Sequence, residues 1–303
     1  MFSKVLIATD SSPSSYATLG CADALYMLGT RECVLAQCFM IKEQVAFPDQ
    51  IKDSIVSSLD TQKEILESKG IKTTVVAELG LAGEQIPKIA EKRNCSLIVA
   101  GSHGHNLANE ILLGGTAAEI IHQTKKPVLI IHLKADEETG KPLYADNNKN
   151  LRHHILYATD FSEHSSLAFE YVCKFVECGT VHVTLLHVQD QARLGIHLKD
   201  RLDEFNEIDK QRLEELKKRL VKIGDAEIDI EIPYGSPVSE ILKRINGTDV
   251  SAVIMGSHGR GFISEIFLGS VSHNVIRHSQ SPVLLIPRQI EGADPTKESC
   301  NIK

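Results

Sequence analysis

Short runs of aliphatic and β-branched residues alternate along the chain with longer stretches in which apolar residues recur at helical spacing. The runs are nearly continuous, which is typical of strands that are covered on both faces, as in a parallel sheet. We expect strands over residues 5–10, 33–39, 73–79, 96–102 and 127–133, and in the second half over residues 155–160, 181–188, 227–232, 252–257 and 282–287. This alternation predicts right-handed crossovers and a doubly wound α/β sheet.

The clearest helical stretch spans residues 200–224. Its apolar positions recur at helical spacing, at Leu202, Phe205, Leu213, Leu216 and Leu220. The charged residues between them are expected to form a solvated face.

The chain contains two copies of one pattern. Three landmarks recur at one constant spacing, namely Gly80 with Gly235, Gly101 with Gly256, and Pro127 with Pro282. The repeat predicts two tandem Rossmann-like domains over residues 1–134 and 151–289, each with a five-stranded parallel sheet. The polar residues 135–150 are expected to be a linker, and residues 290–303 a flexible tail.

Composition removes several classes of function. The net charge is −7, with no stripe of Lys and Arg that would neutralise a phosphate backbone, so we expect no nucleic-acid partner. No apolar run is long enough to span a membrane and no secretory leader is recognisable, so we expect a cytoplasmic protein without a membrane partner. The seven cysteines form no C-x-x-C pair and are expected to be reduced core residues.

Two glycine-rich loops carry the candidate chemistry. The tetrapeptide "GSHG" stands at residues 101–104 and 256–259, and a further glycine, Gly114 or Gly269, precedes a helical stretch in each copy. Each loop follows a strand, at the carboxyl edge where ligands of parallel sheets bind. Glycines admit an anion close to backbone N–H groups, and a helix start adds unpaired donors, so the loops predict phosphate binding. Ser270 would add a hydroxyl and serve as the helix N-cap.

A plain loop followed by a cap would have the same local sequence, but its recurrence in both halves favours a binding site. Asp10 and Asp160 end the first strand of each half, where a carboxylate can bind a ribose or base, approach a metal, or cap the next helix. His103 and His258 lie inside the loops and are expected to bind phosphate rather than to catalyse.

Other chemistries are not indicated. No G-x-x-x-x-G-K-[ST] loop is present, and "GSHGRG" does not match G-x-G-x-x-G. The histidines and cysteines lack metal-ligand spacing, so we expect no metal site formed by the protein alone. His153 and His154 are expected to lie at the surface. We identify no catalytic residues.

Both halves resemble the universal stress protein family, in particular tandem two-domain members with the ATP-binding motif G-x-x-G-x9-G-[ST]. The resemblance rests on T-D at the end of the first strand and on the glycine loop after the fourth, and it covers nearly all of the chain apart from the linker and tail. It implies an adenine-nucleotide-binding domain with strand order 3-2-1-4-5. Family domains pair through their fifth strands, which implies an internal pseudo-dimer and a homodimer built on it.

The resemblance also implies the nucleotide-binding residues. In the second half these are Ala158, Thr159, Asp160, Val188, Met255, Gly256, His258, Gly259, Gly269, Ser270 and Val271. In the first half they are Ala8, Thr9, Asp10, Phe39, Gly101, His103, Gly104, Gly114, Gly115 and Thr116.

The first half departs from this motif. Gly115 stands where Ser or Thr is expected, with Thr116 one place later, and Phe39 replaces the counterpart of Val188. One lost hydrogen bond is worth about 0.5–1.5 kcal/mol, so we expect the first half to bind more weakly than the second.

The resulting hypothesis is a stress-response regulator or sensor that binds ATP, ADP or AMP, with Mg²⁺ joining the phosphates, and that changes its association with unidentified regulatory protein partners. Neither loop supplies a base, nucleophile and positioned lysine for fast phosphoryl transfer, so at most slow ATP hydrolysis is expected. An adenylating enzyme is one alternative, although its H-I-G-H or S-G-G-x-D-S signatures are absent. An interaction protein with vestigial pockets is the other.

Overall fold

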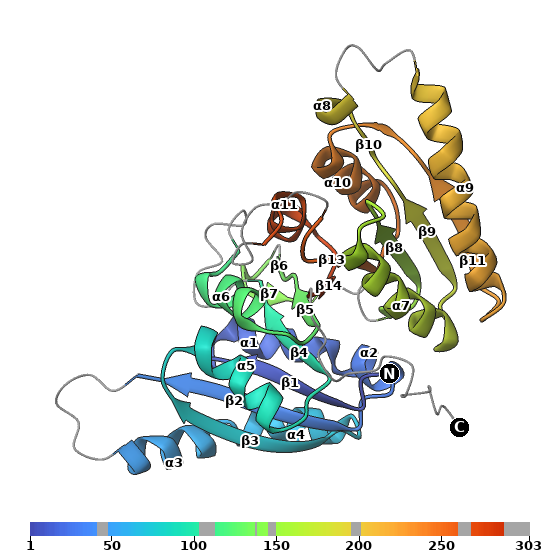
Figure 1. Cartoon of the computed structure of the whole chain (residues 1–303). Helices are drawn as coiled ribbons and strands as arrows, with labels where there is room; N and C mark the ends of the chain where they lie inside the picture. Colours follow the sequence, from blue (N-terminus) through green and yellow to red (C-terminus); the bar gives the residue numbers. More distant parts are fainter. Residues whose placement is uncertain are drawn as a thin grey trace. The chain divides into compact units, whose positions relative to one another are not determined.

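The structure is a computed structural model that describes residues 1–40, 48–102, 113–136, 138–144, 150–194, 201–259 and 268–287. The chain divides into two compact units, one within residues 1–149 and the other within residues 150–288. Each unit is described by itself, and Figure 1 labels the elements of both.

The first unit contains a parallel sheet. Its strands are β1 (Lys4–Thr9), β2 (Glu32–Phe39), β3 (Lys72–Leu79), β4 (Leu97–Gly101) and β5 (Val128–Ile131). They lie in the order β5-β4-β1-β2-β3, and every neighbouring pair is parallel. The expected order 3-2-1-4-5 is confirmed in this unit.

The helices of the first unit connect these strands. They are α1 (Pro13–Thr18), α2 (Ala22–Met27), α3 (Pro48–Ser58), α4 (Asp60–Ser68), α5 (Ala82–Lys92) and α6 (Gly115–Gln123), with a 3₁₀ turn at Leu19–Cys21. Right-handed crossovers put α1 to α4 on one face of the sheet and α5 and α6, which contact each other, on the opposite face.

The segment predicted as a linker contains a short antiparallel ladder between β6 (Lys134–Ala135) and β7 (Pro142–Leu143). Thr139 closes its turn by donating its backbone N–H to the Asp136 carboxylate at 2.8 Å. The end of this segment is anchored, because Tyr144 is buried against Gly20.

The second unit repeats the topology. Its strands β8 (His154–Ala158), β9 (His182–Leu186), β11 (Glu227–Glu231), β13 (Ala252–Gly256) and β14 (Val283–Ile286) are parallel in the order β11-β9-β8-β13-β14. The main helices are α7 (Glu163–Glu177), α9 (Leu202–Val221), α10 (Pro237–Gly247) and α11 (Ser270–His278). The helix expected over residues 200–224 is therefore confirmed as α9, drawn in gold in Figure 1.

Short elements extend the second unit at its carboxyl edge. Strand β10 (Gln189–Asp190) pairs in parallel with β12 (Tyr234–Gly235), and α8 (Gln191–Leu194) follows β10. Crossover handedness places α7 and α9 on one face of the sheet and α10 and α11, which contact each other, on the other face.

The core of each unit lies on both faces of its sheet. In β8, every residue from His154 to Ala158 is buried, as are all residues of β13. Helix α7 closes one face with Phe169, Val172 and Val176, which share one side of the helix and are almost fully buried. Burial on both faces explains why the strand sequences are continuously apolar.

Most described cysteines are part of this core. Cys21, Cys33, Cys38, Cys95 and Cys173 are free thiols, and burial raises the pKa of Cys21 to about 12. Cys178 is disulfide-bonded, so the expectation of reduced cysteines is wrong at this position. Among the described helices, none has the length and apolar character that a membrane span requires.

Candidate functional site

The same tight turn follows the first strand of both units. Ser11 and Phe161 occupy the left-handed region, with φ of 60° and 58°, directly after Asp10 and Asp160. The Asp160 carboxylate accepts the backbone N–H of Ser162 at 3.0 Å. A non-glycine residue in this region costs of order 1–3 kcal/mol, so its recurrence in both units marks a turn that the surrounding structure enforces.

The N-caps of α1 and α7 are serines and not the aspartates, for which a capping role was one of the alternatives. Ser12 caps α1 and Ser162 caps α7, each by accepting the backbone N–H three residues later. Asp10 and Asp160 are therefore not the N-caps. They close the turn before the cap, and this arrangement holds their carboxylates at the carboxyl edge of the sheet.

The glycine loop of the second unit lies directly against this turn. A Cβ added to Gly259 would stand 2.6 Å from Oδ2 of Asp160, and one added to Gly256 would stand 3.0 Å from the backbone of His164. The first distance is shorter than real Cβ contacts, so a larger residue at 259 would displace the Asp160 carboxylate, and the second is tighter than most Cβ contacts, so the backbone at His164 would have to move slightly. The two glycines thus allow the loop to approach the turn closely.

The start of the helix after the loop corrects one expectation. Gly269, with φ −57° and ψ 141°, is the N-cap of α11, and Ser270 is its first helical residue. Ser270 is exposed and lies in the lining of a cavity. Because no side chain caps this helix, its first N–H groups remain available to an anion.

A cavity of about 830 Å³ opens at the carboxyl edge of the second sheet. It lies where β8, β9 and β13 end and where α11 begins, and helix α9 forms another of its walls. The structure brings all of the residues expected in the second half to this cavity, namely Ala158, Thr159, Asp160, Val188, Met255, Gly256, His258, Gly259, Gly269, Ser270 and Val271. Its volume is in the range of small-molecule sites.

Val188 contributes its backbone to this cavity. The N–H groups of its two neighbours, His187 and Gln189, bond to Glu231 and Pro233 on the side of β11. Successive peptide groups of an extended chain point to opposite sides, so the N–H and C=O of Val188 point away from β11, toward the β8 side. Strand β8 has already ended at Ala158, so it does not pair with Val188. Within the described residues neither group has a hydrogen-bond partner, so both can bind a ligand.

The sequence analysis missed several residues in this cavity. Asp209 is buried and accepts hydrogen bonds from Gln189 Nε2 at 2.8 Å and from Arg212 Nη1 at 3.0 Å. His187 Nε2 lies 3.5 Å from the same carboxylate, and His187 Nδ1 donates to the carbonyl of Thr159 at 2.8 Å. The expectation that the charged face of α9 is solvated is therefore wrong at Asp209.

A sequence signal for this wall was present. Phe205, Ile208, Asp209 and Arg212 all line the cavity, and their spacing places them on one side of α9. A solvated helix face is mainly polar, so large apolar residues beside charged ones on the same side of α9 indicate that this side is covered by other parts of the protein.

Comparison with known proteins identifies the same two repeated units. The model of the universal stress protein family matches residues 1–132 and 152–287, which together make up most of the chain. The chain belongs to the universal stress protein family.

Individual relatives are consistent with this membership. A universal stress protein of Methanocaldococcus jannaschii is 38% identical over 154 residues, covering 45% of this chain and 94% of the relative. A universal stress protein of Mycolicibacterium smegmatis is 22% identical over 231 residues and 74% of each chain. The crystal structure of a universal stress protein from Archaeoglobus fulgidus has a TM-score of 0.65 and 24% identity, and it covers 95% of this chain and 97% of its own, which shows a shared fold.

The first universal stress protein unit places its expected residues at the equivalent edge. Ala8, Thr9 and Asp10 stand where β1 ends, Phe39 ends β2 and Gly101 ends β4, while Gly114, Gly115 and Thr116 begin α6. His103 and Gly104 lie outside the described residues. The Thr9 hydroxyl donates to Oε1 of the buried Gln62 at 2.9 Å, whereas Thr159 in the second unit donates to Ser165 at 3.0 Å.

Gly114 caps α6 with φ −59° and ψ 141°, which are nearly the angles of Gly269. A Cβ added at Gly115 would meet nothing within 4 Å. The backbone of the loop end is therefore the same in both units, and Gly115 lacks only the side chain that Ser270 has.

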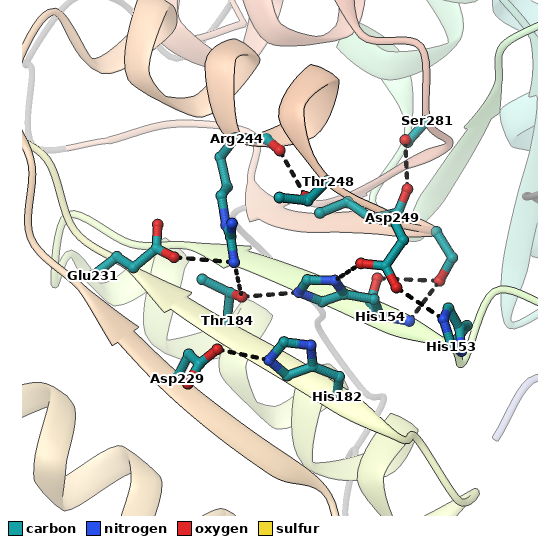
Figure 2. A network of polar contacts seen from close by, with 12 residues as sticks. His153, His154, His182, Thr184, Asp229, Glu231, Arg244, Thr248, Asp249 and Ser281 are labelled. Atoms are coloured by element: carbon teal, nitrogen blue, oxygen red, sulfur yellow. Dashed lines mark hydrogen bonds and ion pairs between the residues drawn. The ribbon is translucent and has the colours of Figure 1, made fainter.

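A second polar cluster lies at the opposite edge of the second sheet, where strands β8 and β9 begin (Figure 2). His154 donates from Nδ1 to the Asp249 carboxylate at 2.7 Å, while its Nε2 accepts the Thr184 hydroxyl at 2.9 Å. His153 is half-exposed and contacts the other oxygen of Asp249. His154 is only 1% exposed, so the expectation of a surface residue is wrong for it.

Burial, the largest cause, lowers the pKa of His154 and keeps the ring neutral. The hydrogen bond from His154 lowers the pKa of Asp249 to about 2. Among the described residues, no group of three or more His, Cys, Asp or Glu side chains is placed to hold a metal ion. We interpret this cluster as a structural connection between β8, β9 and the segment before β13.

Proposed function

We propose that the second unit binds an adenine nucleotide and that occupancy of the pocket regulates association of the protein with partner proteins. The single observation that carries the proposal is the composition of one cavity. Its lining combines the carboxylate of Asp160, the backbone of Val188 and the open N-terminus of α11. These are a ribose acceptor, a base-recognition edge and a phosphate donor set, respectively.

The phosphates would lie at the glycine loop. The N–H groups at the start of α11 and the Ser270 hydroxyl would donate to them, and the dipole of α11 favours negative charge at that end. Mg²⁺ would enter bound to the phosphates and would keep water molecules as further ligands. The first unit would bind more weakly, because Gly115 lacks the hydroxyl of Ser270.

The cavity supports binding more than chemistry. Fast phosphoryl transfer requires a base that positions the attacking group and a cation that neutralises developing charge. Within the described residues no lysine lines this cavity, and its two arginines, Arg193 and Arg212, are paired with Asp190 and Asp209. A regulatory role, in which the nucleotide is bound and retained, fits this lining better than turnover.

The test is to denature by heat the protein purified without added nucleotide and to separate the supernatant by anion exchange. We expect ATP, ADP or AMP from the wild type and none from Gly259→Val, whose side chain would meet Asp160. Gly247→Val is the matched control, because a Cβ at Gly247 meets nothing within 4 Å and Gly247 lies outside the cavity lining.

Two outcomes are decisive. Nucleotide that is lost in Gly259→Val but kept in Gly247→Val would support the site. A clean wild-type supernatant, together with no calorimetric heat on adding Mg-ATP, would overturn the proposal and favour an interaction protein with vestigial pockets.

A further inference from the structure

One wall of the cavity carries hydrogen-bond acceptors, whereas the glycine loop offers N–H donors. Gln189 and Asp209, whose side chains we name the acceptor wall, are residues with exposures of only 5% and 8%, and both line the cavity. Gln189 follows β9, and Asp209 belongs to α9. The wall therefore forms only when the end of a strand and a helix pack together.

The acceptor wall is held in place by its own contacts. Gln189 Nε2 donates to Asp209 Oδ2 at 2.8 Å, and Arg212 Nη1 donates to Asp209 Oδ1 at 3.0 Å. His187 approaches Oδ2 to 3.5 Å and binds the carbonyl of Thr159 through its other nitrogen, so it positions the wall relative to the turn of Asp160. Such fixed orientation is what a recognition surface requires.

A structural role alone does not explain a carboxylate at this place. The same cavity is lined by the apolar side chains of Leu186, Phe205 and Ile241, which would close it without a charge. Burying a carboxylate costs free energy, and the donors Gln189 and Arg212 offset that cost here without requiring a charge at this place. A few fixed polar groups in an otherwise apolar pocket are typical of a surface that orients a ligand.

The wall presents acceptors. An ionised carboxylate only accepts, and because the Gln189 amide nitrogen is bound to Asp209, its Oε1 is the atom left for other partners. Within the described residues, Oε1 takes no hydrogen bond. The glycine loop and the start of α11 present N–H donors instead, while Arg212 beside the wall directs its Nη1 to Asp209. A complementary ligand carries an anion at one end and an N–H donor at the other.

We propose that Gln189 and Asp209 bind the exocyclic amino group of the nucleotide base and so select adenine over a purine with a 6-oxo group. This inference rests on the proposed function and deepens it. A 6-oxo group would face acceptors with an acceptor of its own, which leaves buried polar groups unpaired. Such a mismatch costs about 1–3 kcal/mol, which corresponds to roughly 10- to 100-fold in affinity.

The test compares ATP with inosine triphosphate, which has the same ribose and phosphates. Calorimetric titration of the wild-type full chain is expected to show ATP binding about 10- to 100-fold more tightly. In Asp209→Asn, whose amide can donate to a 6-oxo group, the ratio is expected to fall to within about threefold. Asp203→Asn on the same helix is the matched control, since Asp203 is exposed and lies outside this cavity lining, and it is expected to keep the wild-type ratio.

Gln189→Met, which keeps the side-chain length without polar atoms, is the second variant if Asp209→Asn fails to fold, and it is expected to reduce the ratio as well. Equal wild-type affinities for the two nucleotides would overturn the inference while leaving nucleotide binding intact. An unchanged ratio in folded Asp209→Asn would also overturn it. Absence of binding to both nucleotides would overturn the proposed function, and the inference would fall with it.

Discussion

The imidazole rings of His154 and His182 stack face to face, with centroids 3.9 Å apart and planes inclined by 21°. Each ring has its own carboxylate, since Asp249 binds His154 and Asp229 binds His182 Nε2 at 2.9 Å. Figure 2 shows the two histidines at the starts of the neighbouring strands β8 and β9, with Asp229 on β11 and Asp249 in the segment before β13. Two positive charges at this separation would repel each other, so a charge on His182 lowers the pKa of His154.

This stack predicts a loss of stability on mild acidification. Burial lowers the pKa of His154 below the value of about 6.5 for an unfolded histidine, so the unfolded chain binds more protons. The free energy of unfolding therefore falls as the pH drops below about 6.5. The charged groups around the ring oppose each other, because Asp249 raises its pKa while His182 and Arg244 lower it.

Urea denaturation of the wild type and of His154→Asn at pH 7.5 and at pH 5.5 measures this effect. Asparagine keeps a donor for Asp249 but does not titrate, so the variant is expected to be less stable at pH 7.5 and to lose less stability on acidification. The neighbouring His153→Asn should keep the wild-type pH dependence. The same loss in the wild type and His154→Asn would contradict the assignment.

Asp160 is predicted to read the ribose of the bound nucleotide. Because its carboxylate lies at the cavity beside Gly259, 2′-deoxy-ATP should bind the wild type several-fold more weakly than ATP. Asp160→Asn still closes the turn to Ser162, but it should bind both nucleotides with similar affinity. Four calorimetric titrations form a double-mutant cycle that measures the coupling energy between the Asp160 carboxylate and the ribose 2′-hydroxyl. A coupling energy of zero would contradict the proposed contact between them.

Gly115 is predicted to be the position that weakens the first unit. In the full chain with Gly259→Val silencing the second unit, Gly115→Ser should raise residual nucleotide affinity several-fold, because one hydrogen bond is worth about 0.5–1.5 kcal/mol. The substitution is sterically open, since a Cβ there meets nothing within 4 Å. Gly247→Ser, outside both loops and with nothing within 4 Å of an added Cβ, controls for unspecific effects. Unchanged affinity would show that the hydroxyl is not the missing element.

Tyr157 is predicted to stabilise the turn that carries Asp160. Its hydroxyl donates to the carbonyl of Ser165 at 2.7 Å, and the side chain is 1% exposed. Tyr157→Phe should lower the free energy of unfolding by about 1 kcal/mol in urea denaturation. Tyr234→Phe, at a residue 39% exposed, should leave it unchanged. Equal stabilities of all three proteins would mean that the bond contributes nothing.

Much of the fold could be predicted because its signals are local. The continuously apolar strands, the helix of residues 202–221 and the spacing from Gly256 to Gly269 are patterns within short stretches of chain. Parallel strands and right-handed crossovers then restrict the topology to few choices. The exact cap could not be predicted in the same way, because Gly269 and Ser270 are both acceptable N-caps and backbone angles decide between them.

By itself, the sequence determined two repeated doubly wound units and placed the ends of their strands, their aspartates and their glycine loops at one edge of each sheet. Only the tertiary structure decided that Asp209 faces a cavity beside Gln189 and that His154 meets Asp249, a residue 95 positions away. Periodicity along a chain records which side of an element is covered. It does not record which distant side chain covers it, because that depends on how helices and strands pack in three dimensions.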